Sequence, residues 1–230
     1  MVRPTRPKAV LCDLDGTLVD TASEIAAAVN DTLLNGGLPA LESDRIARWV
    51  GHGARDLMRS VMAYVHDESA AEAQVRAGFE ATLDRFRRHY AERTGTTGEL
   101  YEGVRACLSQ CAATGLALAV VTNKDTAFAR KSLAANGILD GFAALVCGDT
   151  LDTLKPDPAG VHAVLTQLGC APSEAVFIGD SSVDVETARR AGVRVLAFSR
   201  GYNRGEPIER AQPDAVFDHW SEVPGLLGLG

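Results

Sequence analysis

Short apolar runs alternate with longer amphipathic segments along most of the chain. Five of the apolar runs are too short for helices, lack polar–apolar alternation and stop at glycine or polar residues, as strands covered on both faces do. They span residues 8–14, 116–122, 143–147, 175–180 and 193–198. This pattern predicts an α/β fold with an open, Rossmann-like parallel sheet.

Helix-like segments separate these runs from residue 101 onward. Each of the four segments ends in glycine, which accepts the left-handed conformation found after helix ends. They span residues 101–115, 125–137, 157–169 and 182–192. The repeated strand–helix–strand order predicts parallel strands joined by right-handed crossovers.

A helical insert is expected directly after the first strand. Residues 21–37 read as a helix that begins at Thr or Ser and ends at a glycine pair. Residues 73–93 place five apolar side chains on one helix face, namely Val75, Phe79, Leu83, Phe86 and Tyr90. No strand is expected within residues 20–93, and the Gly- and Thr-rich residues 93–100 read as a linker. We therefore divide the chain into a core, 1–19 and 97–230, and an insert, 20–96.

Composition narrows the function classes. The chain is 46% hydrophobic and 23% charged, and its net charge of -7 argues against a nucleic-acid partner. No apolar run reaches the ~18 residues of a membrane span, and the N-terminus lacks a signal-peptide core, so we expect a cytoplasmic protein away from membranes. The five cysteines form no CxxC pair and are expected to be reduced core residues. Both a monomer and a homodimer are compatible with this composition.

Chemically capable residues stand where the predicted strands end. Ligands of parallel sheets bind beyond this carboxyl edge. Each residue has a structural explanation when taken alone, such as a helix cap or a solvated surface charge, but together they mark one sheet edge. They are Asp13, Asp15, Thr122, Asn123, Lys155, Asp180, Ser181 and Asp184.

This set suits phosphoryl transfer. Asp13, Asp15 and Asp180 would repel one another unless a cation lay among them. Carboxylate and carbonyl oxygens are the ligands that Mg²⁺ prefers, so we expect Mg²⁺ as cofactor. Thr122 and Asn123 offer donors for phosphate oxygens at a helix start, and Lys155 supplies a positive charge that balances the charge developing on phosphorus. The expected partner is a small phosphorylated metabolite.

Four segments resemble the motifs of the haloacid dehalogenase superfamily, in the expected order. They are "DLDGTLVD", "VVTNK", "LKPDP" and "IGDSSVDVETARRAG". Within the superfamily, "RWVGHGARDLM", "YEGV" and "RGYNRGEPIERAQPD" are similar to the phosphoglycolate phosphatase family. The resemblance covers nearly the whole chain and implies an enzyme that hydrolyses 2-phosphoglycolate to glycolate and phosphate.

The resemblance also implies a role for each motif residue. Asp13 would be the nucleophile that becomes an aspartyl phosphate, and Asp15 the general acid and then the general base. The metal would be held by the Asp13 carboxylate, the Asp15 main-chain carbonyl and Asp180. Residues expected to order this site from outside are Thr17, Ser181 and Asp184, while Gly16 lets the chain turn sharply beside the phosphate.

The insert resembles a cap that closes over the site and excludes water. Its turn "GHGARD", residues 51–56, lies before a helix and could bind an anion through its backbone N–H groups. His52 and Arg55 are our candidates for the carboxylate of the substrate. The alternative is a turn between helices with polar surface side chains.

Several other functions remain open from the sequence. A phosphatase for another small metabolite such as a sugar phosphate, or a sugar phosphomutase, would share the same core. A receiver-type phospho-Asp signalling module, or an inactive binding homologue, represents a different class. Dehalogenation is disfavoured, because attack on carbon would not require Asp15, Asp180 and a cation together.

Overall fold

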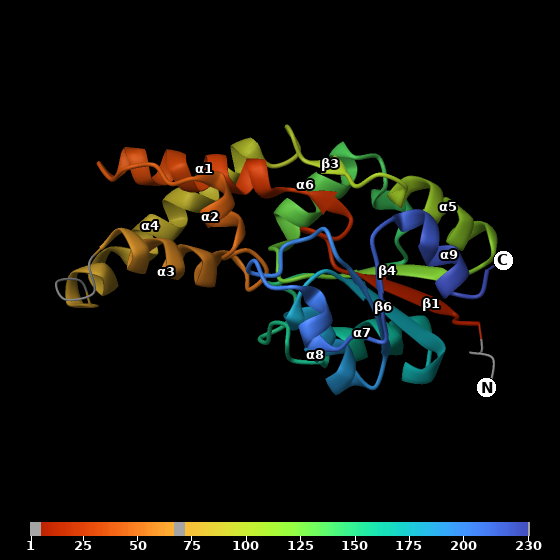
Figure 1. The fold of residues 1–230 in the computed structure, drawn as a ribbon. Helices are drawn as coiled ribbons and strands as arrows, with labels where there is room; N and C mark the ends of the chain where they lie inside the picture. The colour runs from red at the N-terminus through yellow and green to blue at the C-terminus, as the bar shows by residue number, and fades with distance from the viewer. Residues whose placement is uncertain (1–5, 67–71, 230) are drawn as a thin grey trace.

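The computed structural model describes residues 6–66 and 72–229. Its centre is a six-stranded parallel sheet in the order β5-β4-β1-β6-β7-β8, so the first strand of the chain lies in the middle (Figure 1). The strands are β1 (Ala9–Cys12), β4 (Ala117–Val121), β5 (Ala144–Val146), β6 (Ala175–Gly179), β7 (Arg194–Phe198) and β8 (Ala215–Phe217).

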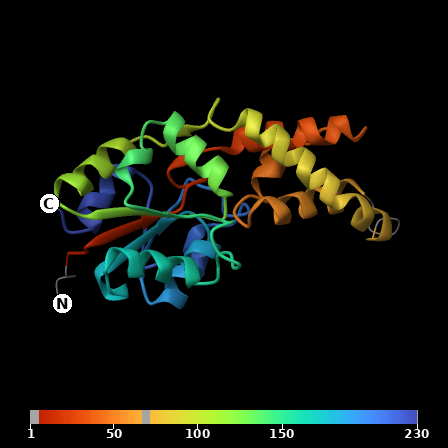
Figure 2. The ribbon, with the colours of Figure 1, turned by 180° about the vertical axis from the view of Figure 1, so that it is seen from behind.

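Helices cover both faces of this sheet, as expected for strands that are apolar on both sides. On one face pack α5 (Val104–Ala113), α6 (Thr126–Ala135) and α9 (Val223–Leu226). On the other face pack α7 (Ala159–Leu168) and α8 (Ser182–Ala191) (Figure 2). The predicted α/β class with an open parallel sheet is confirmed. The glycines that follow α5 to α8 all have positive φ, as their positions predicted.

Two strand predictions need correction. Val19–Asp20 forms β2 and Glu99–Leu100 forms β3, and these pair antiparallel where the chain leaves and re-enters the core. The sequence pattern instead places Asp20 in a strand-free insert and residues 93–100 in a linker. The edge strand β8 is not predicted by the pattern either. Strands of two or three residues carry too little periodicity to be recognised from sequence.

Four helices form a second body beside the sheet, at its carboxyl edge (Figure 1). They are α1 (Ala22–Asn35), α2 (Ser43–Ala47), α3 (Ala54–Val65) and α4 (Glu72–Arg93). Their apolar faces meet in a separate core that includes Leu83, Phe86 and Tyr90, as the spacing on α4 predicted, with Phe79 at its margin. The side chain of Val75 lies outside the described part of the chain, as do residues 1–5.

The connection between the two bodies is tied by a buried carboxylate. Glu24, in the first turn of α1, is 1% exposed. Its Oε1 accepts hydrogen bonds from three successive backbone N–H groups, those of Thr96, Thr97 and Gly98, at 2.7, 2.9 and 2.8 Å. The returning chain is therefore held against the departing one just before β3.

No helix within the described ranges is both long and apolar enough to cross a lipid bilayer.

Candidate active site

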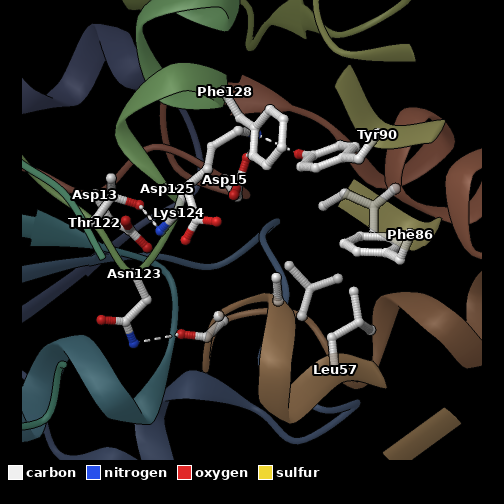
Figure 3. A pocket seen from close by; sticks show the side chains of 15 residues that line it. Asp13, Asp15, Leu57, Phe86, Tyr90, Thr122, Asn123, Lys124, Asp125 and Phe128 are labelled. Carbon is white, nitrogen blue, oxygen red and sulfur yellow. Dashed lines mark hydrogen bonds and ion pairs between the residues drawn. The ribbon is translucent and has the colours of Figure 1, made fainter. Parts of the chain in front are cut away.

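The strand-end residues gather at the carboxyl edge of β1, β4 and β6, as expected. Four of them, Asp13, Asp15, Thr122 and Asn123, line a pocket between this edge and the helical body. Figure 3 shows its polar wall, with Asp13, Thr122 and Asn123, opposite an apolar wall that includes Leu57 and Phe86. The pocket is therefore closed on one side by the core and on the other by α1, α3 and α4.

Three carboxylates form an acidic group within the edge. Asp13, Asp180 and Asp184 are buried, and each has an oxygen within 4.8 Å of the others. Burial raises the pKa of Asp13 to about 6, although the nearby Lys155 opposes this shift. Burial and then repulsion from Asp184 and Asp13 raise the pKa of Asp180 well above its usual value. This group is a candidate cation site, because a metal ion would relieve both effects.

Lys155 is the ammonium nearest to these acids. Its Nζ lies 2.9 Å from Asp13 Oδ1 and 2.6 Å from Asp184 Oδ1. Asp13 Oδ1 is buried, and among the described residues it accepts no hydrogen bond of normal geometry, so its contact with Lys155 is an ion pair only. An oxygen in this state has a lone pair left for a cation or for attack.

The carboxylate of Asp184 accepts hydrogen bonds from donors of the nearby loop. Its Oδ2 accepts hydrogen bonds from Ser181 Oγ at 2.7 Å and from the backbone N–H groups of Ser181 and Asp180. Gly179 leaves room for it, because a Cβ there would lie 2.3 Å from the Asp184 side chain. Through these contacts and its ion pair with Lys155, Asp184 joins the loop at Ser181 to the Lys155 side chain.

Asp180 is enclosed by two glycines. Thr17 Oγ1 donates to its Oδ1 at 2.5 Å, and the backbone N–H of Tyr202 donates to Oδ2 at 2.5 Å. A Cβ on Gly16, whose φ is +81°, would lie 2.4 Å from Asp180 Oδ2, and one on Gly201 would lie 2.2 Å from Asp180 Cβ. The sharp turn at Gly16 is thus required by the close approach of Asp180 as well as by its φ.

Asp15 is held from two sides by residues that the sequence analysis did not assign to the site. Its Oδ1 accepts hydrogen bonds from Thr21 Oγ1 at 2.8 Å and from Lys124 Nζ at 2.6 Å. Thr21 does precede α1 as expected, but its hydroxyl turns to Asp15 and makes no cap bond. Lys124 also donates to the hydroxyl of Tyr90, on α4. The sequence does not reveal the role of Lys124, because a lysine beside a helix start carries no periodic signal.

Asn123 uses its side chain differently from the prediction. Its amide donates to the carbonyls of Gly51 and Lys155, both at 3.0 Å, and its Oδ1 accepts from the Lys155 N–H at 2.8 Å. With the amide occupied, the side chain positions the Lys155 loop and the turn after α2 and is not free to bind phosphate. Thr122 is buried beside it in the pocket wall, where its hydroxyl accepts a long bond from Lys124 N–H.

The turn at residues 51–56 reaches the pocket through its backbone. Gly51, Gly53 and Ala54 line the cavity, and a Cβ on Gly53 would lie 3.2 Å from the Asn123 carbonyl oxygen. Arg55, by contrast, points to α4, where it forms a bidentate pair with Glu80 at 2.6 and 2.9 Å on the surface. The structure therefore does not bring Arg55 into the pocket, contrary to expectation.

His52, in the same turn, neither lines the pocket nor lies fully on the surface. It is partly buried, and it does not belong to the residues that line the described pocket. Burial and the charge of Arg204 lower its pKa, so it is held towards the neutral form. A neutral imidazole offers a hydrogen bond to a substrate but no charge.

The apolar wall was also absent from the sequence-based site. Ile25, Leu57, Phe86 and Phe128 line it together with Tyr90. The Tyr90 ring lies 4.8 Å from that of Phe128 and 5.4 Å from that of Phe86, so α4 packs directly on α6 of the core. The apolar face predicted for α4 thus serves two surfaces: part of it packs in the core of the insert, and part of it lines the pocket.

Comparison with known proteins gives a consistent result. Residues 10–198 match the family described as haloacid dehalogenase-like hydrolase. A phosphoglycolate phosphatase of Pectobacterium atrosepticum is 37% identical over 99% of this chain and 95% of its own length. One of Rhodospirillum rubrum is 40% identical over 97% of this chain and 92% of its own.

A solved structure agrees in fold. The crystal structure of a predicted phosphoglycolate phosphatase from Haemophilus somnus superposes with a TM-score of 0.91 at 31% identity, covering 96% of this chain and 98% of that one. Together with the family match, this similarity excludes the receiver-type module that the sequence had left open.

Proposed function

Because the chain belongs to the haloacid dehalogenase-like hydrolase family, we propose that it is a phosphatase that hydrolyses 2-phosphoglycolate to glycolate and inorganic phosphate. The relatives named above carry that activity in their names and match over nearly their whole length. The observation that carries the proposal is the joint position of four residues at one sheet edge: Asp13 and Asp15 line the pocket, and Lys155 and Asp180 lie against Asp13.

The proposed cofactor is Mg²⁺. The Asp13 carboxylate, the Asp15 main-chain carbonyl and Asp180 would hold it, and the acidic group with its raised pKa values fits a divalent ion bound by oxygen. When bound, the ion neutralises the acids and the phosphoryl oxygens that must approach them. The donors around Asp184 leave this residue outside the ligand set.

The proposed reaction has two steps. Asp13 attacks phosphorus, the ester P–O bond breaks, and Asp15 gives its proton to the departing alkoxide of glycolate. Water then attacks the aspartyl phosphate, Asp15 takes the proton from this water, and the P–O bond to Asp13 breaks. Thr21 and Lys124 both contact Oδ1 of Asp15, which leaves Oδ2 for the proton.

Lys155 and Thr122 would receive the phosphoryl group. Lys155 is 5% exposed, so its charge acts in a site largely free of water, where electrostatic stabilisation is strong. Asn123 keeps this lysine in place through two hydrogen bonds to its backbone. The side chain of Asn123 would therefore contribute to phosphate binding only indirectly, through the position of Lys155.

Residues 20–96 are proposed as a cap domain inserted into the core, 1–19 and 97–230. The separate apolar core of α1 to α4 and the β2–β3 pair at its base support these boundaries. The insert covers the pocket and excludes water from the reacting groups. We further propose a cytoplasmic monomer or homodimer that acts on a small metabolite without a nucleic-acid or membrane partner. The five free cysteines agree with a reducing compartment.

A phosphate-release screen tests this function. Purified protein with Mg²⁺ is offered 2-phosphoglycolate, glucose 1-phosphate, glucose 6-phosphate and p-nitrophenyl phosphate. We expect the highest kcat/KM with 2-phosphoglycolate. Higher kcat/KM with a sugar phosphate would identify a different metabolite phosphatase, and conversion between sugar phosphates that requires a bisphosphate would identify a mutase.

A further inference from the structure

The pocket is also lined by a cation, Lys124, that the proposed chemistry uses only to hold Asp15 and to which it gives no contact with the substrate. Among the described residues that line it, only Lys124 is a lysine or an arginine. The wall opposite Asp13 is mostly apolar (Figure 3). A substrate with a carboxylate needs a cation at this end, because an unpaired charge is costly in such surroundings. Arg55, the cation that the sequence suggested, faces Glu80 outside the pocket.

Lys124 is built into the pocket floor. Its side chain is 2% exposed, its Nζ lies 2.6 Å from Asp15 Oδ1 and 2.5 Å from Tyr90 Oη, and it stands 4.9 Å from the Tyr90 ring centroid. An ammonium has three donors, and within the described chain two of them have these partners. The third remains for a ligand.

The position of Lys124 relative to Asp15 fits a short substrate. Asp15 is the proposed proton donor to the ester oxygen, so this oxygen must lie against its carboxylate. In 2-phosphoglycolate a single CH₂ group separates the ester oxygen from the carboxylate carbon. A cation that already touches Asp15 is therefore near the carboxylate whenever the ester oxygen is in place.

We propose that Lys124, positioned by Tyr90, is the specificity-determining residue that binds the carboxylate next to the scissile ester. This inference rests on the proposed function and names the group that selects its substrate. Because Lys124 belongs to the core and Tyr90 to α4, the carboxylate site is complete only when the helical insert covers the sheet edge. A substrate of the same size without a carboxylate would leave Lys124 paired with Asp15 and gain nothing from it.

Lys124→Met tests the proposal with a pair of substrates. Methionine keeps much of the length and removes the charge. The kcat/KM for phosphoglycolate is divided by that for ethyl phosphate, which has the same two carbons and no carboxylate. Any loss through Asp15 affects both substrates, so the ratio reports the carboxylate alone. We expect the ratio to fall by about 10- to 100-fold, the range for a hydrogen bond to a charged group.

Two further variants separate recognition from packing. Tyr90→Phe keeps the ring and removes the hydroxyl, and it should lower the ratio by a smaller factor, chiefly through KM. Lys131→Met is the matched control, because Lys131 lies on α6, is exposed and also bonds the insert, at the Ala91 carbonyl, but lies outside the pocket. Its ratio should remain that of the wild type.

Inhibition by glycolate gives a readout without phosphoryl transfer to the ligand. Glycolate should compete with p-nitrophenyl phosphate, and its Ki should rise at least about tenfold in Lys124→Met. If this variant does not fold, as judged by circular dichroism, Lys124→Gln takes its place. An unchanged substrate ratio and glycolate Ki would overturn the assignment of Lys124 while leaving the phosphatase intact. Failure of the wild type to hydrolyse 2-phosphoglycolate would overturn the proposed function, and the inference with it.

Discussion

Lys155 Nζ lies 2.9 Å from Asp13 Oδ1, although the two residues are separated by more than half of the chain. The lysine is fixed on its other side by Asp184 at 2.6 Å. The pair thus brings the proposed nucleophile and the positive charge for the phosphoryl group to one point. Their neighbour Asp180 has a carboxylate oxygen within 4.8 Å of those of Asp13 and Asp184, and this acidic group is the proposed Mg²⁺ site.

Asp13→Asn should abolish turnover. The amide is a poor nucleophile, and the loss should be at least about 10³-fold because the reaction needs a very large rate enhancement. The measurement is phosphate release with Mg²⁺, together with a circular dichroism spectrum to verify the fold. Asp140→Asn is the control, since Asp140 is exposed and distant in the chain. Retention of more than about a tenth of the activity would remove Asp13 from this role.

Mg²⁺ should stabilise the protein more at pH 8 than at pH 5. The pKa of Asp13 is raised to about 6 in the folded state, so the folded protein holds a proton that the unfolded chain has lost. Without metal, stability therefore falls as pH rises from the unfolded value towards 6 and stays low above it. Metal binding requires the deprotonated acids and offsets this loss at high pH.

A thermal melt with and without Mg²⁺ measures this effect. At 100 times the Kd a ligand contributes about 2.7 kcal/mol, which corresponds to a shift of roughly 5–10 °C for a chain of this size. Asp180→Asn should remove most of the shift. EDTA should abolish activity, and Ca²⁺ should restore little of it, because it prefers longer bonds and more ligands. Full activity in metal-free buffer would contradict the cation site.

Asp15→Asn should separate proton transfer from metal binding. The variant keeps the main-chain carbonyl and an amide oxygen that can still accept from Thr21 and Lys124, so the side chain should remain in position. The expected loss is about 10²–10⁴-fold for 2-phosphoglycolate. The first step should be less affected with p-nitrophenyl phosphate, whose leaving group needs no proton. Single-turnover kinetics that show the same loss for both substrates would argue against Asp15 as the acid.

Arg55→Ala should leave catalysis nearly unchanged. Arg55 pairs with Glu80 at the surface, and exposed ion pairs of this kind contribute little. We expect the kcat/KM for 2-phosphoglycolate to change by less than about threefold, and Glu80→Ala to behave in the same way. A tenfold rise in KM for 2-phosphoglycolate alone would instead support the original expectation that Arg55 reads the carboxylate.

Glu24→Ala should destabilise the junction between core and insert. The variant removes the buried carboxylate that accepts from the N–H groups of residues 96–98, and it should lower the free energy of unfolding by about 1–3 kcal/mol. Urea unfolding measures the change. Glu102→Ala, at an exposed position of the core, is the control. Equal stability of the two variants would show that the junction does not depend on this carboxylate.

The central features of the site could be predicted because they follow from local sequence and sheet topology. Parallel strands joined by right-handed crossovers must end at the same edge, so acids at the ends of β1 and β6 are brought together by any fold of this class. Asp13 and Asp180 are therefore neighbours as a consequence of their positions after apolar runs. The glycine at position 16 likewise predicted the sharp turn that the Asp180 side chain requires.

The cap contacts could be decided only by the tertiary structure. Helical spacing placed Phe86 and Tyr90 on one apolar face, but it could not tell that Tyr90 turns its hydroxyl to Lys124 of the core. Successive side chains of a helix point about 100° apart. The orientation of α3 therefore places Ala54 in the pocket wall and directs Arg55 to Glu80. The chain by itself determines which residues share a strand end or a helix face. How the core and the insert meet depends on packing between residues far apart in sequence, and that packing brings Tyr90 of the insert against Lys124 of the core.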